Sequence, residues 1–329
     1  MLATALRTMP TLLTLLLVAG CATTGHHSGT TQAEEETPSI APQAMTLVTA
    51  DNTTITWDAL IEQAAAADVI ILGEQHDDLL GHQFQTALVT ALLEKQPVAV
   101  CLEMLERDEQ AFVDAYLADT ITQETLVDVT DSKDWGAKGK WDHFYQPTVD
   151  AAKSAKAPVI AANAPRRFTR LGRFEDFDGL AAFTEDYPNQ FVVPTAIEQG
   201  DYAERFKDTM RHHSAPPTPA KKKGKKKAPE MGGMPPLTEE KLESFFRAQQ
   251  VWDATMADSV VKAQATHGKA VLLIGQFHTD HNGGTLLRMK AAAPDLNYLT
   301  ISLQRDSETT LREEDKDRAD VVVFRPTQE

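Results

Sequence analysis

Cysteine is scarce in this sequence, which has only Cys21 and Cys101 among 329 residues. A disulfide framework, or a zinc site built from several thiolates, needs more cysteines than this, so both are excluded. Cys101 lies within an apolar run and is expected to be a small buried core residue. Cys21 follows an apolar N-terminal stretch, and this setting predicts a different role for it.

Positive charge and long apolar runs are also in short supply. The chain carries 32 Lys and Arg against 48 Asp and Glu, for a formal net charge of −16. Such a protein repels a phosphate backbone, so nucleic acid is not expected as a partner. No apolar run after Cys21 approaches the ~18 residues that a transmembrane helix needs, so a membrane-spanning helix is not expected.

The N-terminus has the features of an export signal. Arg7 precedes an apolar run from Leu12 to Val18, and Val18-Ala19-Gly20-Cys21 resembles a bacterial lipobox. We therefore expect a lipoprotein signal peptide over 1–20 and an acylated Cys21. Residue 22 is not Asp, the residue that usually signals inner-membrane retention. The expected location is the cell envelope, with a lipid anchor in the outer membrane.

The chain after Cys21 divides into a tether and a folded region. Residues 21–44 are rich in Thr, Ser, Gly, Glu and Pro, which is typical of a flexible tether. The folded domain is expected over 45–329. It begins with a possible hairpin over 46–57 that turns at Asp51-Asn52.

Strand-like apolar runs alternate with helix-like stretches through most of this domain. Helical spacing of apolar residues occurs over 86–95, 112–117 and 149–155. Continuous apolar strands separated by helices predict an α/β fold, with a Rossmann-like, mostly parallel sheet and helices on both faces. The strand-like runs are 68–72, 97–103, 158–163, 270–275, 298–302 and 320–324.

The span from 164 to 268 lacks a strong strand pattern. It contains a helical stretch from Leu242 to Thr266 and is expected to be an inserted helical subdomain. Within it, residues 214–236 are rich in Lys and Pro and are predicted to be disordered. The alternative is that these lysines contact anionic lipid headgroups or an anionic ligand.

Two of the apolar runs end in the same pattern, Gly-x-x-His. Gly73 and His76 end the first, and Gly275 and His278 end another about two hundred residues later. The carboxyl ends of parallel strands meet at one sheet edge, so the two histidines are expected to lie close together. The first motif contains Glu74, where the second contains Gln276. This difference favours the first loop for acid–base chemistry.

Other polar residues follow the same strand ends. Each has a structural alternative: Glu74 and Asp77 could cap a helix, and Glu103 could pair with Arg166. Together, however, they supply more imidazole, carboxylate, amide and guanidinium groups than a core needs, which indicates a functional site. The residues expected at this edge also include Asn163, Arg167, Asp280 and His281.

The sequence LGEQHDDLLGHQFQ (72–85) resembles the opening motif of the ChaN-like haem-binding lipoproteins. VIAANAPRR (159–167), AQQVWDATMA (248–257) and LLIGQFH (272–278) fit the same family in order. The wider superfamily includes Tiki-type metalloproteases, TraB-like proteins and erythromycin-esterase-like enzymes. The resemblance implies a Rossmann-like sheet, haem binding, a role in iron acquisition and a homodimer that shares haem. The loop HTDHNGG (278–284) lacks the proline that the family usually has there.

The sequence is consistent with haem binding and with metal-dependent hydrolysis, and the family resemblance favours haem binding. In a haem protein the axial ligand would be His or Tyr, and arginines such as Arg166 would pair with the propionates. In a metal-dependent hydrolase, His76 and His278 would hold zinc or manganese, and Glu74 or Glu103 would act as general base. A catalytically inactive enzyme fold that binds other proteins is the third hypothesis. The candidate haem-binding residues are His76, His82, His278, His281, Glu74, Glu103, Tyr145, Asn163 and Arg166.

Overall fold

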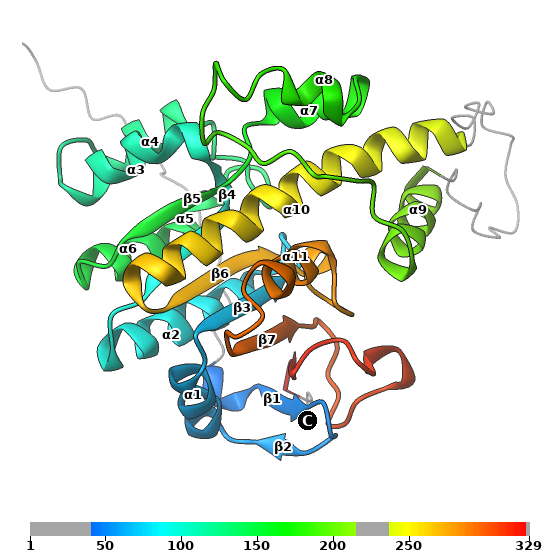
Figure 1. Ribbon diagram of the computed structural model, residues 1–329. Helices are drawn as coiled ribbons and strands as arrows, with labels where there is room; N and C mark the ends of the chain where they lie inside the picture. The colour runs from blue at the N-terminus through cyan, green and yellow to red at the C-terminus, as the bar shows by residue number, and fades with distance from the viewer. Residues whose placement is uncertain (1–40, 215–236, 327–329) are drawn as a thin grey trace, which may run out of the picture. The chain divides into compact units, whose positions relative to one another are not determined.

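The computed structural model describes residues 41–214 and 237–326, and an eight-stranded sheet lies at its centre. The strand order is β2-β1-β8-β7-β3-β6-β4-β5, and every pairing from β8 to β5 is parallel (Figure 1). The strands are β1 Thr46–Thr49, β2 Thr54–Ile55, β3 Val69–Glu74, β4 Ala99–Glu106, β5 Val159–Asn163, β6 Ala270–Gly275, β7 Tyr298–Leu303 and β8 Val321–Phe324. The predicted sheet is confirmed, and so is the predicted hairpin, which forms β1 and β2.

The signal peptide, most of the tether and nearly all of the Lys/Pro-rich insert lie outside the described residues. In the part that the structure describes, no helix is long and apolar enough to cross a membrane.

Helices cover both faces of the sheet. Odd and even residues of the central strands point to opposite faces, so each strand contributes to two clusters of apolar side chains. On one face, Ile70 and Leu72 of β3 pack with α1, α2 and α6, and on the other, Val69 and Ile71 pack with α10 and α11. Cys101 is fully buried in the second cluster, as predicted. The helices are α1 Trp57–Ala66, α2 Leu79–Lys95, α3 Gln110–Leu117, α4 Gln123–Val129, α5 Trp141–Phe144, α6 Gln146–Ser154, α7 Arg166–Phe174, α8 Phe177–Ala181, α9 Asp201–Ser214, α10 Glu239–His267 and α11 Gly284–Ala292.

Between β5 and β6 the described residues form helices α7 to α10 and no strand. The predicted helix Leu242–Thr266 is α10, which begins after the side-chain cap of Thr238 and ends at Gly268, a residue in the left-handed conformation. Its C-terminal half packs on the sheet through Met256 and Val260, and it also contacts α7 and α9 (Figure 1). Part of the predicted helical insertion is therefore one of the layers that cover the sheet.

The chain order places the two Gly-x-x-His loops side by side. In the sheet, β6 lies between β3 and β4, although it comes much later in the chain. β7 lies on the other side of β3. Glu74 of β3 is in register with Gly275 of β6. In open α/β sheets, ligands bind beyond the strand ends at such a point.

Candidate functional site

A pocket of about 270 Å³ lies beyond the carboxyl ends of β3, β4, β5 and β6. The structure brings together here residues from several of the strand ends selected from the sequence, including one histidine from each Gly-x-x-His motif. The lining residues are His76, Glu103, Met104, Glu106, Trp135, Asn163, Arg166, Trp252 and His278.

His76 is the more accessible of the two histidines, with a side chain 38% exposed. Its Nδ1 lies 2.9 Å from Oε1 of Glu74, and its ring packs edge-on against Trp135. The Nε2 edge lies over Gly275, where an added Cβ would be 2.8 Å from Nε2. Glycine at 275 therefore lets the imidazole lie directly against the end of β6.

Glu74 is buried beneath His76 and is surrounded by donors. The hydroxyl of Tyr145 donates to its Oε1 at 2.7 Å, and the amide of Gln85 donates to its Oε2 at 2.8 Å. Burial alone would raise the pKa of Glu74, but the charge on His82 and the hydrogen bond from His76 outweigh it and lower the pKa to about 2. Glu74 therefore orients His76, and the residue at the N-cap of α2 is Asp78.

His278 is held by a residue that the sequence analysis did not select, Asp253 of α10. Its Nδ1 lies 2.7 Å from Oδ1 of Asp253, and its Nε2 is 3.6 Å from Oε1 of Glu103. Asp253 is fully buried and also accepts hydrogen bonds from Tyr202 at 2.8 Å and from Thr285 at 2.7 Å. Each histidine of the pocket therefore has a buried carboxylate at Nδ1.

Glu103 lines the pocket together with the two histidines and is held by the backbone. Its Oε2 accepts the backbone N–H of Gly275 at 2.5 Å, and its own carbonyl accepts the side-chain amide of Asn163 at 2.9 Å. The prediction that this strand ends at Glu103 is wrong, and so is the structural alternative in which Glu103 pairs with Arg166. β4 continues to Glu106, and Arg166 pairs with Glu106, its Nε 3.5 Å from Oε1.

The carboxylates make both imidazoles more basic. Burial alone would lower the pKa of His76, but the hydrogen bond to Glu74 and the charge of Glu103 outweigh it and raise the pKa to about 9. Burial likewise opposes a charge on His278, and Asp253 and Glu103 together raise its pKa. The pocket therefore combines two imidazoles of raised pKa with the carboxylates that raise them.

Two of the candidate ligands lie beneath the pocket and do not line it. His82 is 1% exposed, stacks on Phe144, and has Nε2 3.0 Å from the carbonyl of His76. Tyr145 is fully buried, and burial together with the neighbouring Glu74 raises the pKa of its phenol well above the usual value. Both residues support the loop of the first motif from below.

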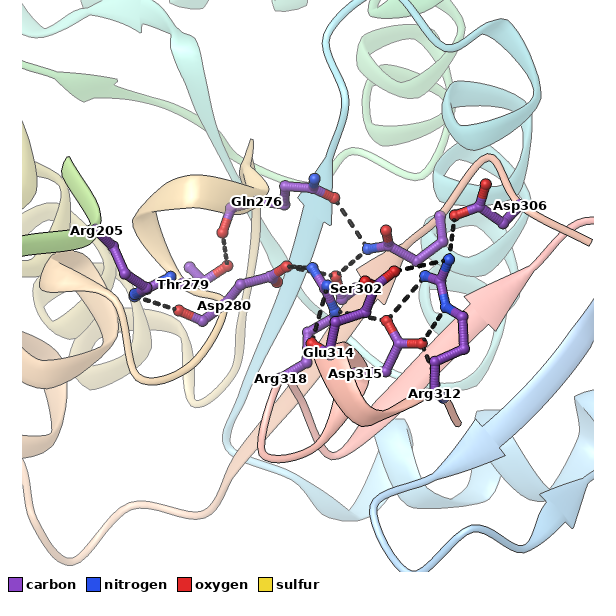
Figure 2. Close-up of polar contacts among 11 residues, drawn as sticks. Arg205, Gln276, Thr279, Asp280, Ser302, Asp306, Arg312, Glu314, Asp315 and Arg318 are labelled. Atoms are coloured by element: carbon purple, nitrogen blue, oxygen red, sulfur yellow. Dashed lines mark hydrogen bonds and ion pairs between the residues drawn. The ribbon is translucent and has the colours of Figure 1, made fainter. Parts of the chain in front are cut away.

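The remaining strand-end residues form contacts away from the pocket. Asp280 accepts hydrogen bonds from Ser302 at 3.0 Å and from Arg318 at 2.7 Å, and Gln276 accepts one from Gln304 at 3.1 Å (Figure 2). These contacts connect the end of β6 to β7 and the C-terminal segment. His281 lines a separate open cleft together with Arg205 and Arg318. Arg167 pairs with Asp108, and Asp77 with Arg305.

Asp253, Trp135 and Trp252 also belong to the site, although none of them was expected there from the sequence. Trp252 and Asp253 fall within AQQVWDATMA, one of the stretches that carry the family resemblance, so that resemblance was an available signal. Trp135 lies in the loop between α4 and α5, and no motif indicated it. Across residues 41–214 and 237–326, no group of three or more His, Cys, Asp or Glu side chains is arranged to hold a metal ion.

The fold and the pocket define a class: an α/β protein with two carboxylate-held histidines at the switch point of a mostly parallel sheet. The family model described as haem-binding uptake, Tiki superfamily, ChaN matches residues 60–289, and the chain belongs to this family. No curated protein matches the sequence significantly.

Solved structures with the same fold include ChaN of Campylobacter jejuni, a structure that describes cofacial haem binding. It is 22% identical to this chain, with a TM-score of 0.60, and the match covers 85% of this chain and 96% of that one. A mutant of the erythromycin esterase EreC in its open conformation is 12% identical over 86% of this chain and 98% of its own, with a TM-score of 0.46. The type III effector HopBA1 is 13% identical over 81% and 91%, with a TM-score of 0.43.

Proposed function

We propose that this protein binds haem in the two-histidine pocket, with His76 as the axial ligand of the iron. The observation that carries the proposal is the geometry of His76. Its Nδ1 is occupied by the buried carboxylate of Glu74, and its side chain lines the pocket and is 38% exposed. Haem iron accepts imidazole nitrogen, and a carboxylate on the other nitrogen fixes the tautomer and strengthens the ligand.

The other residues that line the pocket suit one edge of an amphipathic, anionic ring. Trp135 and Trp252 supply aromatic walls, and the guanidinium of Arg166 lies 5.6 Å from the centre of the Trp135 ring. Arg166 is half exposed, and its Nε lies 3.5 Å from Oε1 of Glu106, so its guanidinium presents positive charge to an anionic ligand. When bound, haem would supply the iron chemistry, and these residues would orient the ring.

His278 is the weaker candidate for the axial ligand. Its side chain is 9% exposed, and its ring nitrogens lie close to Asp253, Glu103 and Gln249. We propose that it fixes Glu103 and the end of β6. Glu103 and Asn163, which also line the pocket, would contact the ligand from the side of β4 and β5.

The same proposal extends to the setting of the protein. We propose a lipoprotein anchored through acylated Cys21 in the outer membrane and facing the periplasm, where it takes part in haem or iron uptake. Membership of the haem-binding uptake family and the Val18–Cys21 sequence support this role. A homodimer that shares haem is part of the proposal. Labelling with a fatty-acid analogue should depend on Cys21 and be lost in Cys21→Ser.

Haemin titration of the full-length chain tests the haem proposal. The wild type should give a shifted Soret band, and His76→Ala should lose most of the affinity or change the band. His143→Ala is the matched control, because His143 is an exposed histidine of α5 outside the pocket and should leave the titration unchanged. A wild-type protein that gives no Soret shift would contradict the proposal.

A second candidate function is hydrolysis, with Glu103 as general base. It is favoured by the position of Glu103, which shares the pocket with two imidazoles that are each held by a carboxylate. Turnover of chromogenic esters with and without added zinc or manganese, lost in Glu103→Gln, would support it. Absence of turnover under all these conditions would contradict the hydrolase function.

A further inference from the structure

A second cavity, of about 370 Å³, lies between α7, α9 and α10. The two spaces adjoin, because Arg166 and Trp252 line both. We call the second cavity the arginine cleft. Arg166, Arg170 and Arg173 of α7 line it, and aromatic side chains such as Phe206 of α9 and Phe245 of α10 face them.

The arginines of the cleft occupy one side of α7. Residues 166, 170 and 173 are spaced by four and three positions, so they share a helix face and extend about 10 Å along it. Arg167, on another face, pairs with Asp108. Neither Arg170 nor Arg173 has a carboxylate partner anywhere in the described parts of the chain. Two guanidiniums without a carboxylate partner among the described residues are unexpected in a chain with a net charge of −16.

Arg173 is in a setting that suits a bound anion. Its guanidinium lies 3.7 Å from the centre of the Phe245 ring, which holds the group in place by a cation–π contact. Its Nε is buried and has no hydrogen-bond acceptor among the residues described. A buried donor without an acceptor costs free energy, and a ligand carboxylate would remove that cost.

The composition of the cleft selects the kind of ligand. Phe206, Phe245 and Trp252 present aromatic surface, and Arg170 and Arg173 are three residues apart on α7, which is about one helical turn along the backbone. Aromatic walls suit a flat apolar body, and two separate guanidiniums suit two carboxylates. A tetrapyrrole with two propionates has this combination, whereas a fatty acid has one carboxylate and a flexible chain.

We propose that the arginine cleft binds the carboxylates of a tetrapyrrole through Arg170 and Arg173, and that it does so without iron. The inference rests on the proposed haem function, because the cleft adjoins the pocket of His76. It goes beyond that function in one respect: the protein should also bind iron-free porphyrin. His76 then contributes the selectivity for iron, and the cleft contributes recognition of the ring and its carboxylates.

The test is a titration of the full-length chain with iron-free protoporphyrin IX, followed by porphyrin fluorescence. Wild type and His76→Ala should bind it equally well. Arg170→Gln combined with Arg173→Gln should weaken binding about tenfold or more, because charged hydrogen bonds to the carboxylates are lost. Arg167→Gln is the matched control, since Arg167 lies on the same helix outside the cleft, and it should leave the affinity unchanged. The dimethyl ester of the porphyrin should bind weakly to every variant.

The outcomes separate the cleft from the haem proposal. Wild-type binding of haemin without binding of protoporphyrin IX would overturn the cleft and leave the haem function standing. Binding of protoporphyrin IX without a haemin Soret shift would contradict the haem function and support the binding role of the cleft. Palmitate that displaces the porphyrin and depends on the same arginines would overturn the preference for a dicarboxylate. Arg170→Gln alone keeps the test valid if the double variant unfolds, because Arg170 is exposed and supports no described contact.

Discussion

The loops after β3 and β6 share the pattern Gly-x-x-His, yet each obtains its carboxylate from a different place. In the first loop, Glu74 lies two residues before His76 in the same motif. In the second, Gln276 occupies the equivalent position and bonds to Gln304, and the carboxylate beside His278 is Asp253 of α10. From the sequence, Glu74 in the first motif and Gln276 in the second favoured the first loop for acid–base chemistry. A helix that is distant in the sequence therefore supplies the carboxylate that the second motif lacks.

The two histidines also differ in access. The side chain of His76 is 38% exposed, whereas that of His278 is 9% exposed and surrounded by Asp253, Glu103 and Gln249. The first loop therefore presents its imidazole to a ligand, and the second connects α10 to the pocket. Substitutions near His76 or near His278 test this division of roles.

The largest effect is expected from Asp253→Ala. This change leaves buried donors of His278, Tyr202 and Thr285 without their acceptor. Breaking a buried ionic network by removing one partner costs about 3–5 kcal/mol, so the free energy of unfolding should fall by that order. Urea unfolding measures it. Glu62→Ala, which removes an exposed partner of Lys95, is the control and should cost less than about 1 kcal/mol. An equally small loss in Asp253→Ala would show that the network is not coupled to stability.

A smaller effect, specific to the first histidine, is expected from Gly275→Ala. The new Cβ would lie 2.8 Å from Nε2 and 2.9 Å from Cε1 of His76, and the ring cannot move far without losing Glu74. We expect a loss of about 1–3 kcal/mol in the free energy of unfolding and weaker haemin binding. Gly73→Ala is the companion change, because its Cβ would lie 3.1 Å from Oγ1 of Thr279 and would not meet the imidazole. Equal haemin affinity in the two variants would contradict the role given to Gly275.

The smallest effect is a pH dependence of stability that arises from His76. Its pKa in the folded protein is raised from 6.5 to about 9, so the folded state holds a proton that the unfolded state releases at lower pH. The stabilisation from this group is complete below pH 6.5 and disappears as the pH rises through about 9. The difference in unfolding free energy between wild type and His76→Gln should therefore shrink across this range. Parallel curves would show that the pKa of His76 is not raised.

The sheet could be predicted because its strands are continuous apolar runs, and such runs can be recognised in short segments of the sequence. The meeting of His76, Glu103, Asn163, Arg166 and His278 was also predictable, because the carboxyl ends of parallel strands share one edge. Both inferences used residue types and chain order alone.

The other parts of the site depend on packing that no local pattern encodes. Asp253 is a buried acid in the middle of a long helix, and its role arises from the way α10 crosses the sheet. Glu106 replaces Glu103 as the partner of Arg166 because β4 continues past its apolar run with an irregularity between Leu102 and Glu106. Tyr145 and His82 were plausible ligands by type, and only their burial under Glu74 and His76 shows their supporting position.

The most direct test of the account is whether added imidazole replaces the side chain of His76. Haemin-loaded wild type, His76→Ala and His278→Ala should be compared by Soret absorption and electron paramagnetic resonance, before and after addition of free imidazole. We expect His76→Ala to lose the wild-type signal and imidazole to restore it, while His278→Ala keeps a histidine-ligated signal. A wild-type spectrum in His76→Ala without imidazole, or its loss only in His278→Ala, would contradict the assignment of the two loops.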